Sequence, residues 1–189
     1  MIYKIFSGNA PIPTDILKQF TSSVRAQSYY YSRMALLECL QSMDQPGELT
    51  DLNIINHHHL EKFPNFLVSL SHTQNVGAGV IAATKECQSI GMDIEFCTRL
   101  IDPKTSKFFK TLHDQEHGGD NLLWLWVKKE ASFKALSSTI LNKTLVLTDI
   151  WIRGDEFGLI KNPQTLGKII LNEENVLGQK LLVAIALLF

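Results

Sequence analysis

Two carboxylates stand two residues apart in an otherwise apolar stretch, IGMDIEF at residues 90–96. Side chains at positions i and i+2 of a strand point to the same face, so Asp93 and Glu95 should lie side by side. Like charges this close raise each other's pKa unless a positive charge lies near them. One interpretation is a strand with a solvated face. The other is part of a site for a hard cation such as Mg²⁺, with a third carboxylate supplied from elsewhere in the chain.

A third acid lies in the stretch WLWVKKEASFKAL at residues 124–136. Glu130 and Lys134 are i and i+4, so they share one face of the predicted helix. An ordinary surface ion pair is one interpretation of this spacing. The neighbouring Trp124 and Trp126 indicate that much of the helix is buried, which favours a functional role for the acid and the base.

Histidines occur at two places that invite a functional reading. His72 follows the alternating strand pattern that ends in SLSHT, and a single histidine there is most often structural or solvated. His57, His58 and His59 are consecutive, so regular backbone does not direct all three at one metal ion. The role of the run from His57 to His59 stays open.

The composition excludes some classes of protein. The chain has 189 residues, 45 % hydrophobic and 20 % charged, with a net charge of −1, which disfavours a general nucleic-acid binder. Three cysteines without a CxxC pair indicate reduced thiols. No signal-peptide pattern and no apolar run long enough to cross a bilayer are found. We therefore expect a cytoplasmic protein that does not span a membrane.

The elements that must position these residues follow an α+β order. A long helix is predicted over 23–43 and a second over 121–138. The predicted strands are 1–6, 65–73, 76–86, 90–96, 143–154, 156–162, 167–171 and 180–189. Strands 65–73, 76–86 and 90–96 are expected to form a meander. No repeat is obvious in the letters, but helix followed by strands occurs twice, which predicts two similar halves, 1–100 and 101–189.

The two acidic stretches together resemble a known family. IGMDIEF followed by WVKKEASFKAL is similar to the two signature motifs of the 4′-phosphopantetheinyl transferase superfamily. SLSHT looks like the upstream Ser-His motif of its larger, surfactin-type members, and RAQSYYYSRMALLECL resembles their N-terminal helix. The resemblance implies a fold in which two α+β halves form a pseudo-dimer, so we expect a monomer.

The resemblance also implies a reaction. The enzyme would transfer the 4′-phosphopantetheine arm of coenzyme A to a serine of an apo acyl or peptidyl carrier protein, and release adenosine 3′,5′-bisphosphate. Mg²⁺ would be held by Asp93, Glu95 and Glu130. Glu130 would act as general base, and Lys134 would pair with phosphate as charge builds on the leaving group. The residues implied to bind coenzyme A are Arg25, Arg33, Ser71, His72, Lys129 and Lys134.

A basic and apolar segment at 104–110, KTSKFFK, is a candidate contact for an acidic carrier protein. Its lysines are Lys104, Lys107 and Lys110, and they stand beside Phe108 and Phe109. A solvated amphipathic helix is the alternative.

Two other functions remain open. One is a different Mg²⁺-dependent phosphoryl-transfer enzyme without a protein acceptor, although no GxxxxGK[ST] motif occurs. The other is a non-catalytic member that binds coenzyme A or a carrier protein.

Overall fold

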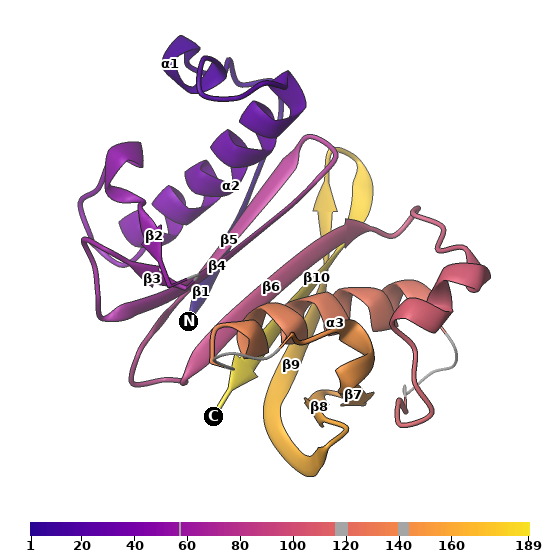
Figure 1. Ribbon diagram of the computed structural model, residues 1–189. Coiled ribbons are helices and arrows are strands. Elements are labelled where there is room, and N and C mark those ends of the chain that lie inside the picture. Colours follow the sequence, from indigo (N-terminus) through magenta and orange to yellow (C-terminus); the bar gives the residue numbers. More distant parts are fainter. Residues whose placement is uncertain (57, 116–120, 140–143) are drawn as a thin grey trace. The chain divides into compact units, whose positions relative to one another are not determined.

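The protein is an α+β chain with two five-stranded antiparallel sheets, seen in a computed structural model that describes residues 1–56, 58–115, 121–139 and 144–189 (Figure 1). It divides into two compact units, Met1–Glu86 and Cys87–Phe189. The division falls after Glu86, earlier in the chain than the predicted boundary at residue 100. The strand β6 (Ser89–Phe96) pairs over its whole length with β10 (Gln179–Leu188), so the acidic stretch belongs to the second unit.

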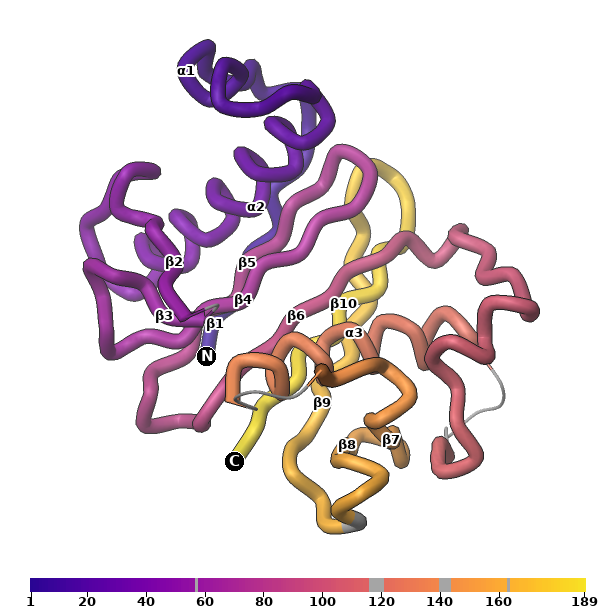
Figure 2. The backbone as a smooth tube through the Cα atoms, in the orientation of Figure 1, coloured from indigo at the N-terminus to yellow at the C-terminus, as the bar shows by residue number. Residues whose placement is uncertain are grey.

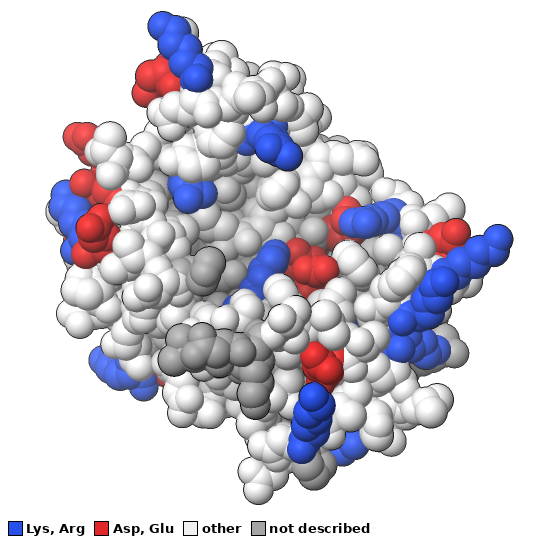
Figure 3. Space-filling model, viewed as in Figure 1, with Lys and Arg blue, Asp and Glu red and all other residues white. Residues whose placement is uncertain are grey.

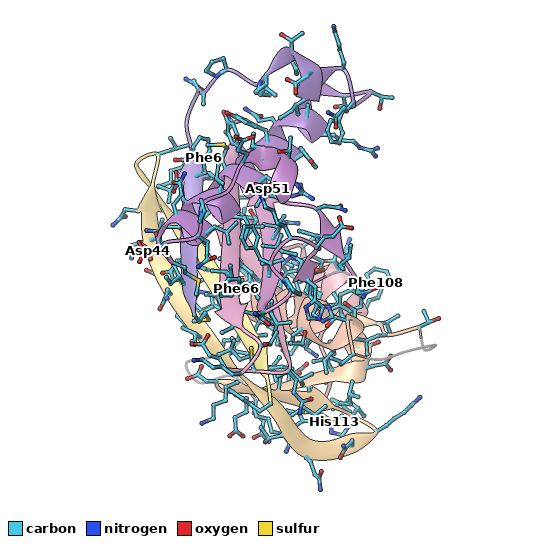
Figure 4. The ribbon with its side chains drawn as sticks, turned by 90° about the vertical axis from the view of Figure 1, so that its left-hand side faces the viewer. Phe6, Asp44, Asp51, Phe66, Phe108 and His113 are labelled. Atoms are coloured by element: carbon cyan, nitrogen blue, oxygen red, sulfur yellow. The ribbon has the colours of Figure 1, made fainter. Side chains whose placement is uncertain are left out.

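The first unit packs one long helix on its sheet. The sheet has the order β1-β5-β4-β3-β2, and the helix is α2 (Ser23–Gln41). The strands are β1 (Ile2–Ser7), β2 (Ile54–Ile55), β3 (His59–Leu60), β4 (Phe66–Thr73) and β5 (Val76–Ala83), with the short helices α1 (Thr14–Leu17) and η1 (Leu49–Asp51) outside the sheet. Buried residues of α2 recur every three or four positions, as helical periodicity requires. Phe6 of β1 packs its ring on Tyr31 of α2, with the centroids 5.4 Å apart (Figure 4).

The second unit has the same plan. Its sheet has the order β6-β10-β9-β8-β7, and α3 (Leu122–Ser137) packs on it. The remaining elements are η2 (Pro103–Phe108), η3 (Leu147–Asp149), β7 (Ile150–Arg153), β8 (Glu156–Leu159) and β9 (Asn162–Val176). Asn121 caps α3, because its side-chain oxygen accepts hydrogen bonds from the backbone N–H groups of Leu123 and Trp124 at 3.1 and 3.3 Å. Figure 2 traces β9 and β10 as one long hairpin.

The two units correspond element by element. In each, the first strand is followed by the long helix, a short 3-10 turn and four more strands, and the last strand lies between the first and the fourth. A short sequence match accompanies this order: LTDLNI begins at Leu49 and LTDIWI at Leu147. In both copies the aspartate side chain accepts a hydrogen bond from the backbone N–H three residues earlier, Asp51 at 3.0 Å and Asp149 at 3.1 Å. The letters therefore do contain a repeat, although one too short to stand out before the topology is known.

Three further details differ from the sequence predictions. Strands β4 and β5 pair with each other, but β6 pairs with β10 and not with β5 among the described residues, so the meander was wrong. Strand β9 is longer than the predicted 167–171 and begins at Asn162. The segment after Pro103, for which a solvated amphipathic helix was the alternative, is a 3-10 helix. It is capped by Asp102, whose carboxylate accepts a hydrogen bond from the Lys104 N–H at 2.9 Å.

Within the described ranges, none of the helices has the length and apolar character needed to cross a bilayer.

Candidate functional site

The site begins at Gly91, where α3 crosses β6 (Figure 1). A Cβ added at Gly91 would lie 2.0 Å from the Ala131 carbonyl oxygen and 2.5 Å from the Ala135 nitrogen. Only glycine on the strand and small residues on the helix allow the two backbones to come this close. The strand and the helix run in opposite directions here, so the close approach brings Lys134 and the preceding turn of the helix, with Glu130, next to Asp93, which follows Gly91 on the same face of the strand.

Asp93 and Lys134 form an ion pair across this contact. The Lys134 Nζ lies 2.9 Å from Asp93 Oδ1 and also donates a hydrogen bond to the Met92 carbonyl oxygen at 2.8 Å. The side chains are 13 % and 31 % exposed, so the pair is sheltered but open to solvent on the lysine side. Lys134, which was predicted to share a helix face with Glu130, therefore also pairs with Asp93 of the strand.

Glu130 lies within electrostatic range of the same charges. Its pKa is raised, first by burial and then by the negative charge of Asp93. Lys134 and Arg99 act in the opposite direction and lower it. Two carboxylates that repel each other in a partly buried place, with cations beside them, are typical of sites that hold a metal ion or move a proton.

Glu95 is held by an arginine that the sequence analysis did not single out. Glu95 Oε2 contacts the Arg99 guanidinium, and Oε1 accepts a hydrogen bond from the Phe96 N–H at 3.1 Å. The Arg99 guanidinium also lies over the Trp126 ring, 5.7 Å from its centroid. The one sequence feature that could have indicated this ion pair is the i, i+4 spacing of Glu95 and Arg99. In a strand followed by a turn, that spacing does not by itself predict a contact.

Lys129 points away from this cluster, although it neighbours Glu130 in sequence. Its side chain is 0 % exposed, and its Nζ lies 2.9 Å from Asp114 Oδ1. It also donates to the carbonyl oxygens of Ile150 and Leu147. Burial lowers the pKa of Lys129, and the charge of Asp114 opposes that effect. The ammonium thus ties α3 to the strand β7, and its predicted contact with coenzyme A has no geometric support.

Asp114 is the second residue that the sequence analysis missed. It accepts hydrogen bonds from the backbone N–H groups of Thr111, at 2.6 Å, and Ile152, at 2.9 Å, in addition to its pair with Lys129. Such a buried carboxylate organises the segment before α3. No local pattern predicted its ion pair, because Lys129 and Ile152 are distant from Asp114 in sequence.

The predicted residues of the first unit lie on α2 and β4. Arg33 is half-buried and its guanidinium lies over the Tyr29 ring, 4.1 Å from the centroid. Burial lowers the pKa of Arg33, with Tyr29 opposing the shift. Its Nε is buried and has no hydrogen-bond partner among the described residues. Arg25 is exposed near the start of the same helix.

Ser71 and His72 point to opposite faces of the first sheet, as neighbours in a strand must. Ser71 is buried and His72 is exposed. His72 pairs with Gly77, and a Cβ at Gly77 would lie 2.3 Å from the Ser32 nitrogen of α2. The register therefore places His72 on the helix-covered face, near the stretch of α2 that carries Arg33, whereas Ser71 faces the other way.

The candidate carrier-binding segment is only partly exposed. Phe108, labelled in Figure 4, lies at the surface. Its side chain is 64 % exposed, and Lys104 and Lys107 are exposed beside it. Phe109 is 0 % exposed and packs edge-on against Trp126, with the ring centroids 5.2 Å apart. Phe109 was therefore wrongly placed in the contact surface, because it belongs to the core beneath α3.

The histidine run falls partly on residues that the structure describes. His57 lies outside the described residues. His58 is buried, His59 is half-buried, and their rings stack with centroids 4.3 Å apart. This arrangement is a packing contact in the first unit.

The carboxylates have the donor chemistry of a magnesium site. Mg²⁺ prefers carboxylate, phosphate and water oxygens, and Asp93, Glu95 and Glu130 supply the first kind. Among the described residues, no three His, Cys, Asp or Glu side chains are already gathered around one point. Lys134 and Arg99 instead neutralise Asp93 and Glu95. The residues fit the ion by type and by proximity of Asp93 to Glu130, and Glu95 would have to leave Arg99 to join them.

Comparison with known proteins gave no relative: no family model matches the chain, and no curated protein matches it.

Charged residues elsewhere do not form a large patch of one sign on the visible face. Figure 3 shows acidic and basic side chains interspersed there, in keeping with the net charge of −1. A highly basic surface of the kind that binds nucleic acid is not seen on this face.

Proposed function

We propose that the protein is a 4′-phosphopantetheinyl transferase with the pseudo-dimeric, surfactin-type fold. It would move the phosphopantetheine arm of coenzyme A onto a serine of an apo acyl or peptidyl carrier protein. The observation that carries the proposal is the contact of β6 with α3 at Gly91. That contact brings together Asp93, Glu130 and Lys134, three residues of the two motifs that resemble the family signatures. The identical strand order of the two units supports the pseudo-dimeric part.

Asp93, Glu95 and Glu130 would hold Mg²⁺ in this enzyme. The bound ion would neutralise charge on the pyrophosphate of coenzyme A. Asp93 and Glu130 already oppose each other electrostatically, so a divalent cation between them relieves a repulsion that is present in the folded chain.

Glu130 would accept the proton of the attacking serine. In the transfer, a bond forms between the serine oxygen and the phosphorus that carries the pantetheine arm. The bond from that phosphorus to the bridging oxygen breaks, and adenosine 3′,5′-bisphosphate leaves. Burial raises the pKa of Glu130, which brings the carboxylate closer to the strength a base needs near neutral pH.

Lys134 would bind phosphate, and the family resemblance assigns the same task to Arg33 and Arg25. The Lys134 ammonium is held by Asp93 and the Met92 carbonyl, so it is positioned before substrate arrives. Arg33 carries a buried Nε that lacks a partner among the described residues, and a phosphate oxygen would satisfy its guanidinium. His72 and Arg25, which the resemblance also assigns to coenzyme A, are exposed.

Intact-protein mass spectrometry of apo carrier proteins tests the proposal. A panel of acyl and peptidyl carriers is incubated with the protein and coenzyme A, either with Mg²⁺ or with a chelator. We expect a gain of one phosphopantetheine group on at least one carrier, lost with chelator. Asp93→Asn, which keeps the shape of the side chain but removes its charge, is expected to lose the gain.

Failure has a defined form. If no carrier gains mass and the protein does not bind coenzyme A in a calorimetric titration, the transferase assignment is wrong. If coenzyme A binds without transfer to any carrier, the protein is a binder that has kept the motifs. A mass gain that persists in chelator would contradict the role of Mg²⁺.

A further inference from the structure

Glu95, one of the three carboxylates proposed to bind the metal ion, has a partner on each of its oxygens. One oxygen accepts the Phe96 N–H and the other contacts the Arg99 guanidinium. Its side chain is 10 % exposed, so water replaces little of what these partners provide. An incoming cation therefore competes with partners that Glu95 already has.

Arg99 can hold the Glu95 carboxylate and can also release it. Its side chain is 46 % exposed, and the guanidinium lies over the Trp126 ring. Trp126 is itself fixed by Phe109, which is fully buried. The ring offers the cation a second contact that does not involve Glu95. Releasing Glu95 does not leave the guanidinium without an attractive neighbour.

The charges around the three carboxylates also favour release of Glu95 by Arg99. Asp93, Glu95 and Glu130 are bracketed by two cations, Lys134 on one side and Arg99 on the other. A divalent ion carries the same charge as these two cations together, so it can replace them without changing the net charge of the cluster. Lys134 has a backbone carbonyl as a further partner, whereas Arg99 is the more exposed of the two and the easier to release.

We propose that Arg99 is a positioning residue that competes with the divalent cation for Glu95. This inference rests on the metal site of the proposed function. Without metal, Arg99 holds Glu95 and neutralises it. When the metal binds, Glu95 turns from Arg99 to the ion, and Arg99 stays over Trp126. The arginine thereby sets the concentration of metal at which the site fills.

A titration with Mn²⁺ tests the competition directly, because Mn²⁺ takes the same oxygen ligands as Mg²⁺ and its free form is counted by electron paramagnetic resonance. The full chain is titrated without coenzyme A or carrier. Arg99→Gln is compared with wild type and with Arg153→Gln. Arg153 is a matched control, since its guanidinium also lies over a tryptophan ring, that of Trp151, at 4.6 Å, in the same unit. Thermal unfolding of each variant verifies that it is folded.

We expect Arg99→Gln to bind Mn²⁺ on the order of three- to tenfold more tightly than wild type, the range for loss of a competing ion pair with one exposed partner. Arg153→Gln should match wild type. Equal affinity in Arg99→Gln, weaker affinity, or no Mn²⁺ binding by any of the three proteins would overturn the inference.

The two proposals fail separately. Carrier modification by wild type, together with equal Mn²⁺ affinities, contradicts only the inference about Arg99. Tighter Mn²⁺ binding by Arg99→Gln, without modification of any carrier, contradicts only the transferase assignment.

Discussion

The first and second units share one strand order, yet they bury different side chains. The buried polar residues of the first unit are Ser32, His58, Ser69 and Ser71. Those of the second include four charged residues: Asp93, Glu95, Lys128 and Lys129. Buried charges are costly unless they are paired, and replacing them with apolar residues often leaves a protein no less stable. The first unit has the same strand order without a buried Asp, Glu, Lys or Arg among its described residues, so the strand order by itself does not call for them.

The difference separates two uses of buried charge within the second unit. Lys129 and Asp114 join elements of the scaffold, since their partners are backbone groups and each other. Asp93, Glu95 and Glu130 have half-exposed cations as neighbours and are partly open to solvent. We therefore assign stability to the first group and chemistry to the second, and the following variants test that division.

The largest effect is expected for the single glutamate of α3. Each long helix contains one acid, Glu38 in α2 and Glu130 in α3. Glu130→Gln should lower carrier modification about 10²- to 10⁴-fold, the range for loss of a general base. Glu38→Gln is the matched control and should keep wild-type turnover. Comparable activity of the two variants in the mass-spectrometric assay would remove Glu130 from the mechanism and weaken the contrast between the units.

Breaking the scaffold pair should lower stability instead. Lys129→Met leaves Asp114 as a buried charge without its cation, so the free energy of unfolding in urea should fall by about 3–5 kcal/mol. Asp114→Asn in the same chain keeps an oxygen acceptor for the backbone donors of Thr111 and Ile152. The double variant should therefore recover part of the loss. A Lys129→Met protein as stable as wild type would show that this pair does not hold α3.

Both units rely on a strand glycine beneath the long helix. A Cβ at Gly77 would lie 2.3 Å from Ser32 backbone, and one at Gly91 would lie 2.0 Å from Ala131 backbone. Gly77→Ala and Gly91→Ala should each destabilise by about 1–3 kcal/mol, because a helix must shift. Only Gly91→Ala should also weaken Mn²⁺ binding by the folded protein. Equal metal affinity in the two variants would separate the acidic cluster from the helix crossing.

The smallest expected effect is a change in thermal stability, because the buried Glu130 carboxylate destabilises the folded state when it is charged. Its pKa is raised above 4.5 in the folded chain, so the folded state binds the proton more tightly than the unfolded state. Stability therefore falls as pH rises from the unfolded pKa through the folded pKa. Glu130→Gln escapes this loss, and with chelator present its Tm should exceed that of wild type by about 1–3 °C at pH 7. The difference should shrink at pH 4, and a lower Tm at pH 7 would contradict the sign.

Local patterns predicted the elements better than their pairing. Helical spacing located α2 and α3, and the run LLVAIALLF at the end of the chain predicted the buried strand β10. The partner of β6 was mistaken because pairing between distant strands leaves no local trace, and the nearest strand was the natural assumption.

The candidate site shows the same limit. The i, i+2 spacing placed Asp93 and Glu95 on one face, and the i, i+4 spacing placed Glu130 with Lys134. The inward orientation of Lys129, the neighbour of Glu130, was not predictable. Its partners are Asp114 and two backbone carbonyls, and all of them are distant from Lys129 in sequence. Arg99 was missed because its significance depends on Trp126, which approaches it only in the folded unit.

The pairing of β6 with β10 also determines when during translation this part of the sheet can form. The strand that carries Asp93 and Glu95 is the first element of its unit to leave the ribosome, but its sheet partner β10 is the last. During translation this strand has unpaired edges until residues 179–188 emerge, whereas the carboxylates keep it from being a wholly apolar segment in the meantime. Charges such as those of Asp93 and Glu95 are of the kind that limits aggregation of an unpaired apolar strand.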